Sequence, residues 1–122
     1  MIGNLGELII YVEDMSRQLR FYRDILGFRV IEPVEDAALD DAYWILLDTG
    51  SCKLVLHGGG KRRFGDDVQK FVFFVDDIDA ARARLVNAGN KVGDVRSQID
   101  GVYVVDAFDP EGNVFSLEHR ET

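Results

Sequence analysis

The chain has 122 residues and a mass of 13.8 kDa, which suits one well-buried domain but not two independent ones. Its hydrophobic content of 47% argues against disorder, and its formal net charge of −8 opposes a nucleic-acid partner, since that affinity rests on many lysine and arginine contacts. No apolar run approaches the roughly 20 residues of a membrane span. Met1 leads almost directly into a predicted strand without a basic leader, and Cys52 is the single cysteine, so we expect a cytoplasmic protein without disulfides.

Two segments of the chain share one pattern: a charged residue, an apolar run, an acidic pair and then a helix. The first covers residues 7–16 and the second residues 70–79, so that Glu7 corresponds to Lys70. Such a repeat predicts two modules that share one core, with a pocket where they meet. We place module one at about residues 1–57, a linker at about 58–67 and module two at about 68–122.

In chain order, the first module begins with a short run of β-branched and aromatic residues, Leu8–Val12, which predicts a buried strand. From Met15 the apolar residues follow helical spacing, and Gly27 ends the helix because it tolerates a left-handed backbone. Residues 36–41 form a predicted polar loop. Strand character recurs in three segments, the last two joined by a tight turn: 28–31, 43–47 and 53–56.

Residues 57–67 combine glycines with charges and show no periodicity, which is typical of a linker. The second module then repeats the order of the first. Its predicted elements are a strand at 71–75, a helix from Ile78 to Ala88 closed by Gly89, a variable stretch to Asp100, and strands at 102–108 and 114–118 around the turn 109–113. Each module is therefore predicted to have the element order βαβββ.

These residues resemble the vicinal oxygen chelate superfamily, which includes glyoxalases, bleomycin-resistance proteins, extradiol dioxygenases and fosfomycin-resistance enzymes. The resemblance covers almost the whole chain and is carried by the segments 12–14, 21–28, 75–82, 88–89 and 109–113. It implies an α+β fold in which two βαβββ modules form an open, barrel-like mixed sheet, a cup with the helices outside. It also implies a homodimer, since members commonly pair, some by swapping modules. It does not specify a reaction.

Metal-dependent members of this superfamily place one ligand on the first and one on the last strand of each module. By this resemblance the four positions are Glu7, Val55, Lys70 and Ser116. Valine has no donor atom, an ammonium has no free lone pair, and a serine hydroxyl is a weak ligand. We therefore expect neither a complete family-type metal site nor another cofactor.

A displaced metal site remains an alternative. His57 and Glu118 lie two residues beyond Val55 and Ser116, so each points to the same face of its strand as that residue. With Glu7 they would supply two carboxylates and one imidazole, a set that suits Fe(II), Mn(II) or Zn(II). The positive charge of Lys70 in the same cup would repel such a cation.

Glu7 and Lys70 occupy equivalent positions, so we expect them to lie near one another at the pocket floor. They would form either a structural ion pair or a pair that binds ligand oxygens and amines. The other candidate ligand contacts are side chains on the strands: Tyr11, Trp44, Val55, His57, Phe74, Tyr103, Ser116 and Glu118. His57 is a candidate ligand contact or general base, and equally a solvated residue at a strand end.

We expect metal-independent binding of a small molecule in the cup, as in bleomycin-resistance proteins. One alternative is a metal-dependent lyase, isomerase or dioxygenase that uses Glu7, His57 and Glu118. A further alternative is a noncatalytic interaction module whose cup is filled by its own side chains.

Overall fold

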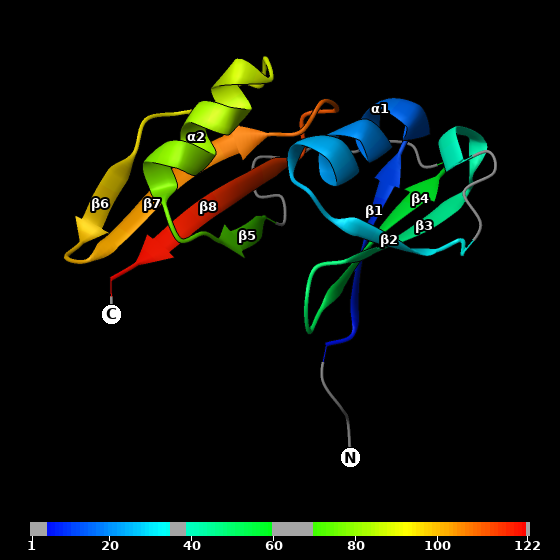
Figure 1. The fold of residues 1–122 in the computed structure, drawn as a ribbon, viewed down its shortest axis with the longest axis horizontal. Coiled ribbons are helices and arrows are strands. Elements are labelled where there is room, and N and C mark those ends of the chain that lie inside the picture. The colour runs from blue at the N-terminus through cyan, green and yellow to red at the C-terminus, as the bar shows by residue number, and fades with distance from the viewer. Residues whose placement is uncertain (1–4, 35–38, 60–69, 122) are drawn as a thin grey trace. The chain divides into compact units, whose positions relative to one another are not determined.

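The chain folds into two compact units, residues 1–63 and residues 64–122, with the same order of elements in each (Figure 1). The computed structural model describes residues 5–34, 39–59 and 70–121. Each unit contains one mixed four-stranded sheet with helical structure on one face. The predicted α+β class and the two βαβββ modules are confirmed.

The sheet of the first unit has the strand order β1-β4-β3-β2. β1 pairs in parallel with β4, and the other pairs are antiparallel. The strands are β1 (Glu7–Val12), β2 (Arg29–Glu32), β3 (Trp44–Asp48) and β4 (Lys53–Gly58).

The helix of the first unit changes its hydrogen-bonding pattern part of the way along. It begins as α1 (Met15–Leu19), where the Asp14 side chain accepts a hydrogen bond from the Arg17 amide. It then continues as a π-helix over Arg20–Ile25, in which the Leu26 amide bonds the carbonyl of Phe21. Gly27 has a φ of +87°, as expected for the residue that ends the helix.

The sheet of the second unit has the order β5-β8-β7-β6, which repeats that of the first. β5 pairs in parallel with β8, and α2 (Ile78–Asn87) packs against β7 and β8 (Figure 1). The strands are β5 (Phe71–Phe74), β6 (Arg96–Ile99), β7 (Val102–Phe108) and β8 (Val114–Arg120).

The register of the parallel pairs relates the positions of the two units. Ile9 pairs with Val55 in the first unit, and Val72 pairs with Ser116 in the second. Val55 and Ser116 are therefore equivalent, and so are the strand positions two residues before Ile9 and Val72, which are Glu7 and Lys70.

Each unit has its core between the helix and one face of the sheet. Side chains that alternate along the strands supply this core, among them Ile10, Val12, Leu54 and Leu56 in the first unit and Val105, Ala107, Phe115 and Leu117 in the second. We call the other face of each sheet its open face. It carries exposed apolar side chains, with Tyr11 54% and Phe74 72% exposed.

Two predicted loops are only partly covered by the described residues. Most of the predicted linker, from residue 60 onward, lies outside them, as do residues 36–38 of the polar loop. The end of that loop, Leu39–Asp41, is a 3-10 turn with Leu39 buried, because an apolar side chain there joins the core. Within the described ranges, no helix has the length and apolar character needed to cross a membrane.

Candidate functional site

A cluster of four polar side chains lies on the open face of the second unit. Asp106, in the middle of β7, pairs with Ser116 across the sheet and accepts a hydrogen bond from its hydroxyl at 2.5 Å. The guanidinium of Arg96 on β6 binds both oxygens of Asp106, at 2.7 and 3.2 Å. The ammonium of Lys70 lies 3.5 Å from Oδ1 of Asp106. We refer to Lys70, Arg96, Asp106 and Ser116 as the Asp106 cluster.

Opposing effects act on the charge of Asp106. Partial burial raises the pKa of this carboxyl, whereas the hydrogen bonds from Arg96 and Ser116 and the nearby charge of Lys70 lower it. The net effect is a pKa below the usual value for aspartate. Asp106 is therefore ionised at neutral pH, and the Asp106 cluster contains two cations and one anion.

Sequence reasoning identified Lys70 and Ser116 as site residues but missed Asp106 and Arg96. A signal for Asp106 was present, because it interrupts the otherwise apolar run Val102–Phe108. A carboxylate inside a sheet needs charged or hydrogen-bonding partners. Arg96 carried no such signal, since its segment showed no clear period.

The positions on the first unit that correspond to Asp106 and Ser116 are apolar. Leu46 pairs with Val55, as Asp106 pairs with Ser116, and both Leu46 and Val55 are buried. This open face therefore lacks a counterpart of the Asp106 cluster among the residues the structure describes.

Aromatic rings surround His57 at the end of β4. The ring centroids of Tyr11 and Tyr43 lie 4.9 Å from that of His57, and the ring of Trp44 lies at 5.6 Å. We call these four residues the His57 cluster. Nδ1 of His57 is 2.8 Å from the carbonyl oxygen of Gly58. Because a carbonyl can only accept, this contact assigns a proton to Nδ1 and leaves Nε2 of the neutral ring as an acceptor.

Phe74 and Glu118, two further predicted contacts, pair with each other in register on the open face of the second unit. Arg120 joins them, since its Nε donates to Glu118 at 3.0 Å and its guanidinium lies 5.6 Å from the centre of the Phe74 ring. An open pocket of about 850 Å³ adjoins these side chains and continues toward His119.

Tyr103 lies on the opposite face of its sheet from Ser116 and Glu118. It pairs with His119, and the two rings stack with centroids 6.3 Å apart. Its hydroxyl donates to Glu121 at 3.1 Å, and this hydrogen bond raises the pKa of the tyrosine. The structure therefore does not bring Tyr103 together with the Asp106 cluster.

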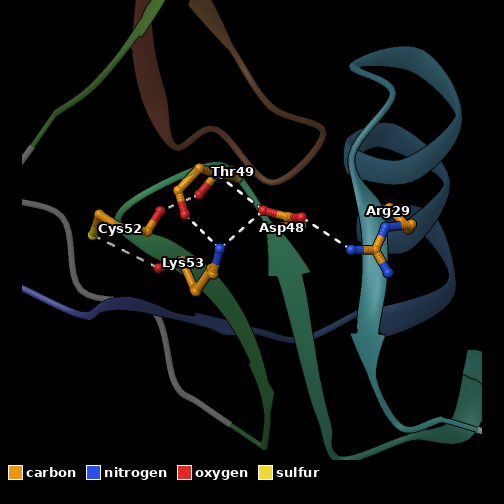
Figure 2. A network of polar contacts seen from close by, with 6 residues as sticks. Arg29, Asp48, Thr49, Cys52 and Lys53 are labelled. Atoms are coloured by element: carbon orange, nitrogen blue, oxygen red, sulfur yellow. Dashed lines mark hydrogen bonds and ion pairs between the residues drawn. The ribbon is translucent and has the colours of Figure 1, made fainter.

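A second polar network closes the β3–β4 hairpin (Figure 2). The carboxylate of Asp48 accepts hydrogen bonds from Lys53 at 3.0 Å and from Arg29 at 3.1 Å. The side-chain hydrogen bond from Lys53, aided by the backbone amide of Gly50, lowers the pKa of Asp48 to about 2. All donors around Asp48 come from its own hairpin and the adjacent strand, which indicates a structural role.

The family metal positions do not fit a metal ion. Val55 offers no donor atom, while Lys70 is a cation and the hydroxyl of Ser116 donates a hydrogen bond to Asp106. The described residues include no group of three histidine, cysteine, aspartate or glutamate side chains suited to hold a metal.

The displaced set is also not assembled within the first unit. Glu7 pairs with Lys53, whereas His57 pairs with Tyr11, four residues farther along β1. This separation is about 13 Å at the strand rise of about 3.3 Å per residue. Glu118 is bound by Arg120. The expected pair of Glu7 with Lys70 stays a prediction, since these residues belong to different units.

Comparison with solved structures places the fold among known ones. The antibiotic-binding protein TnmS3 from Streptomyces sp. CB03234 has a TM-score of 0.78 and 21% identity, with 98% of each chain covered. A lactoylglutathione lyase from Agrobacterium tumefaciens has a TM-score of 0.72 and 21% identity, over 97% of this chain and 94% of that one.

A glyoxalase/bleomycin resistance protein/dioxygenase family enzyme from Burkholderia phytofirmans PsJN has a TM-score of 0.76 and 19% identity, over 98% of this chain and 100% of that one. At these identities the likeness concerns the fold alone. No curated protein matches the sequence.

The sequence itself provides the assignment to a family. The family model of the Glyoxalase/Bleomycin resistance protein/Dioxygenase superfamily matches residues 4–117, which is nearly the whole chain. This chain therefore belongs to the glyoxalase/bleomycin resistance protein/dioxygenase superfamily.

Proposed function

We propose that this protein binds a small apolar or aromatic molecule on its open sheet faces without using a metal ion. The observation that carries the proposal is the His57 cluster. It combines exposed aromatic rings with one imidazole nitrogen that can accept a hydrogen bond. Binding sites for small molecules commonly consist of such an apolar surface with a few placed polar groups.

The side chains at the family metal positions support binding rather than metal-dependent catalysis. Val55 and Ser116 are poor ligands, and Lys70 brings a positive charge to the same face as Ser116. TnmS3, which shares the fold, is described as an antibiotic-binding protein. We therefore favour a binding protein over a lyase, isomerase or dioxygenase.

Isothermal titration calorimetry with 2-naphthamide and with metal-free bleomycin, both in the presence of EDTA, tests the proposal. We expect at least one of these planar or heteroaromatic probes to bind. The Tyr11→Leu variant should bind it about tenfold more weakly, because stacking of one ring is worth on the order of 1 kcal/mol or more.

Tyr103→Leu is the matched control, since it removes the same ring from the other face of the other sheet, and its affinity should equal that of the wild type. Binding that requires added Fe(II), Mn(II) or Zn(II) would instead support the metalloenzyme. Absence of binding by both probes would favour the interaction module.

Two further expectations accompany this proposal: a cytoplasmic location and a homodimer. Light scattering on the purified protein measures the second, and a monomer at micromolar concentration would contradict it.

A further inference from the structure

We propose that the Asp106 cluster recognises the carboxylate of an apolar organic acid, with Lys70 as the group that contacts it. This inference rests on the proposed function, because it specifies the ligand class that the open face of the second unit accepts.

The charge of the cluster favours a monoanion. Lys70 and Arg96 carry two positive charges, and Asp106 carries one negative charge that both cations share. One positive charge therefore remains uncompensated among these side chains. A carboxylate balances it, whereas a phosphate dianion would leave an excess negative charge beside Asp106.

The geometry around Asp106 leaves Lys70 with hydrogen-bonding capacity. Oδ1 of Asp106 already accepts hydrogen bonds from the hydroxyl of Ser116 and from Nη2 of Arg96, which occupy its two lone pairs. The ammonium of Lys70 lies 3.5 Å from the same oxygen, at the outer limit of a hydrogen bond. Asp106 thus holds Lys70 by charge without using up its N–H donors.

Arg96 has a different part in the site. Its planar guanidinium binds both oxygens of Asp106, which is the strongest geometry for such a pair. Arg96 therefore fixes the carboxylate of Asp106, and Asp106 in turn positions Lys70. The side chains of Lys70, Arg96 and Asp106 are each between a third and two-fifths exposed, so a small anion can reach them.

Apolar side chains next to the cluster indicate the rest of the ligand. Val72 pairs with Ser116 on β8, and Phe74 lies two residues farther along β5 on the same face. Val72 is 47% exposed, and Phe74 is more exposed still. Burial of these side chains by a ligand would be favourable, so the acid should carry an apolar or aromatic body.

Calorimetry at pH 7 with 2-naphthoate, 2-naphthamide and acetate tests the assignment. The first two probes have the same aromatic body and differ in charge, whereas acetate has the charge alone. We expect 2-naphthoate to bind at least about tenfold more tightly than 2-naphthamide, because its carboxylate accepts a charge-assisted hydrogen bond. Acetate should bind more weakly than 2-naphthoate because it lacks the apolar body.

The Lys70→Gln variant should lose this preference, with about tenfold weaker binding of 2-naphthoate and unchanged binding of 2-naphthamide. Lys70→Arg should retain the preference, since it keeps the charge. The matched control is Arg82→Gln on α2, which removes one positive charge, a 3.6 Å ion pair to Asp94 and a 2.8 Å hydrogen bond to the carbonyl of Gly93, all outside the Asp106 cluster. Its affinity for 2-naphthoate should stay at the wild-type value.

Equal binding of 2-naphthoate and 2-naphthamide by the wild type would overturn the carboxylate assignment and leave the proposed function standing. A loss of 2-naphthoate affinity in Arg82→Gln as large as that in Lys70→Gln would also overturn the carboxylate assignment. It would show that the affinity depends on the net charge of the protein. Tighter binding of inorganic phosphate than of 2-naphthoate would also overturn the assignment. If 2-naphthoate, 2-naphthamide and metal-free bleomycin all fail to bind, the proposed function fails as well.

Discussion

Asp106 holds together the polar side chains on the open face of the second unit. Its carboxylate bonds Arg96 and Ser116 and lies near Lys70, and these contacts span three strands and the residue before β5. Without its charge, Arg96 and Lys70 would repel each other on a half-buried surface.

We therefore expect a measurable coupling between Asp106 and Arg96. In a double-mutant cycle of Asp106→Asn and Arg96→Gln, urea unfolding should give a coupling free energy of about 1 kcal/mol, the upper range for a partly exposed bidentate pair. The cycle of Arg82→Gln with Asp94→Asn is the control, because Asp94 is fully exposed and the pair is 3.6 Å long. Equal couplings in the two cycles would contradict a special role for Asp106.

A second prediction concerns the contribution of Asp48 to the pH dependence of the free energy of unfolding. The hydrogen bond from Lys53 lowers the pKa of Asp48 to about 2, below the unfolded value of about 3.9. A carboxyl with a lowered pKa stabilises the fold above its unfolded pKa, and this contribution disappears as the pH falls through about 4 to 2.

Asp48→Asn should therefore be less stable than the wild type at pH 7, with the difference shrinking toward pH 2. Urea unfolding at pH 7, 5 and 3 measures this trend. Asp100→Asn, at an exposed turn, serves as the control. If the free energies of unfolding of the wild type and Asp48→Asn differ by a constant amount over this pH range, the carboxylate charge of Asp48 is not what stabilises the hairpin.

At the scale of single residues, the sequence predicted only part of the candidate site. Lys70 and Ser116 were found because the resemblance places ligand positions on the first and last strands of each module, and His57 because it lies two residues beyond one of these positions. Asp106 and Arg96 lie on middle and edge strands, where the resemblance supplies no ligand position. Their pairing depends on cross-strand register, and only the structure gives this.

The two α-helices, α1 and α2, each begin at an aspartate that follows a strand. Asp77 has an extended backbone, and its side chain accepts a hydrogen bond from the Ala80 amide at 3.0 Å, as Asp14 does for Arg17. This N-cap satisfies one of the amides that a helix leaves without a partner.

Asp77→Ala should lower the free energy of unfolding by about 1 kcal/mol. Asp77→Ser should recover most of that loss, because serine also caps helices well. Urea unfolding followed by circular dichroism measures both. Equal stabilities of the alanine and serine variants would show that the cap contributes little to α2.

The predicted strands and helices match the structure because their signals are local. Alternating and apolar runs identified the strands to within about two residues, and Gly27 and Gly89 marked the ends of the helices. The π-helix over Arg20–Ile25 was not predicted, since its apolar spacing also fits an α-helix. The βαβββ order implied a strand before residue 102, but the bounds of β6 were not predicted because Arg96–Ile99 is short and largely polar.

At the scale of the whole molecule, the two copies of one unit share their strand order but differ in side-chain chemistry. Glu7 and Val55 of the first unit correspond to Lys70 and Ser116 of the second. Duplication therefore explains the fold, whereas the differences between the copies bear on function.

We expect protein purified without added metal to contain no stoichiometric Fe, Mn, Ni or Zn by elemental analysis. The double variant Lys70→His with Ser116→Glu should then bind a divalent cation, because it adds an imidazole and a carboxylate near the carboxylate of Asp106. Calorimetry with Zn(II) compares the two proteins. One equivalent of metal in the wild type would contradict the proposed metal-independent function.

Trp44 is the sole tryptophan of the chain, and its indole lies beside the imidazole of His57. The intrinsic fluorescence of the native protein therefore reports on the surroundings of that histidine. The same signal reports on any molecule that displaces or covers that histidine, so the protein carries its own optical probe at the place where we expect ligands to bind.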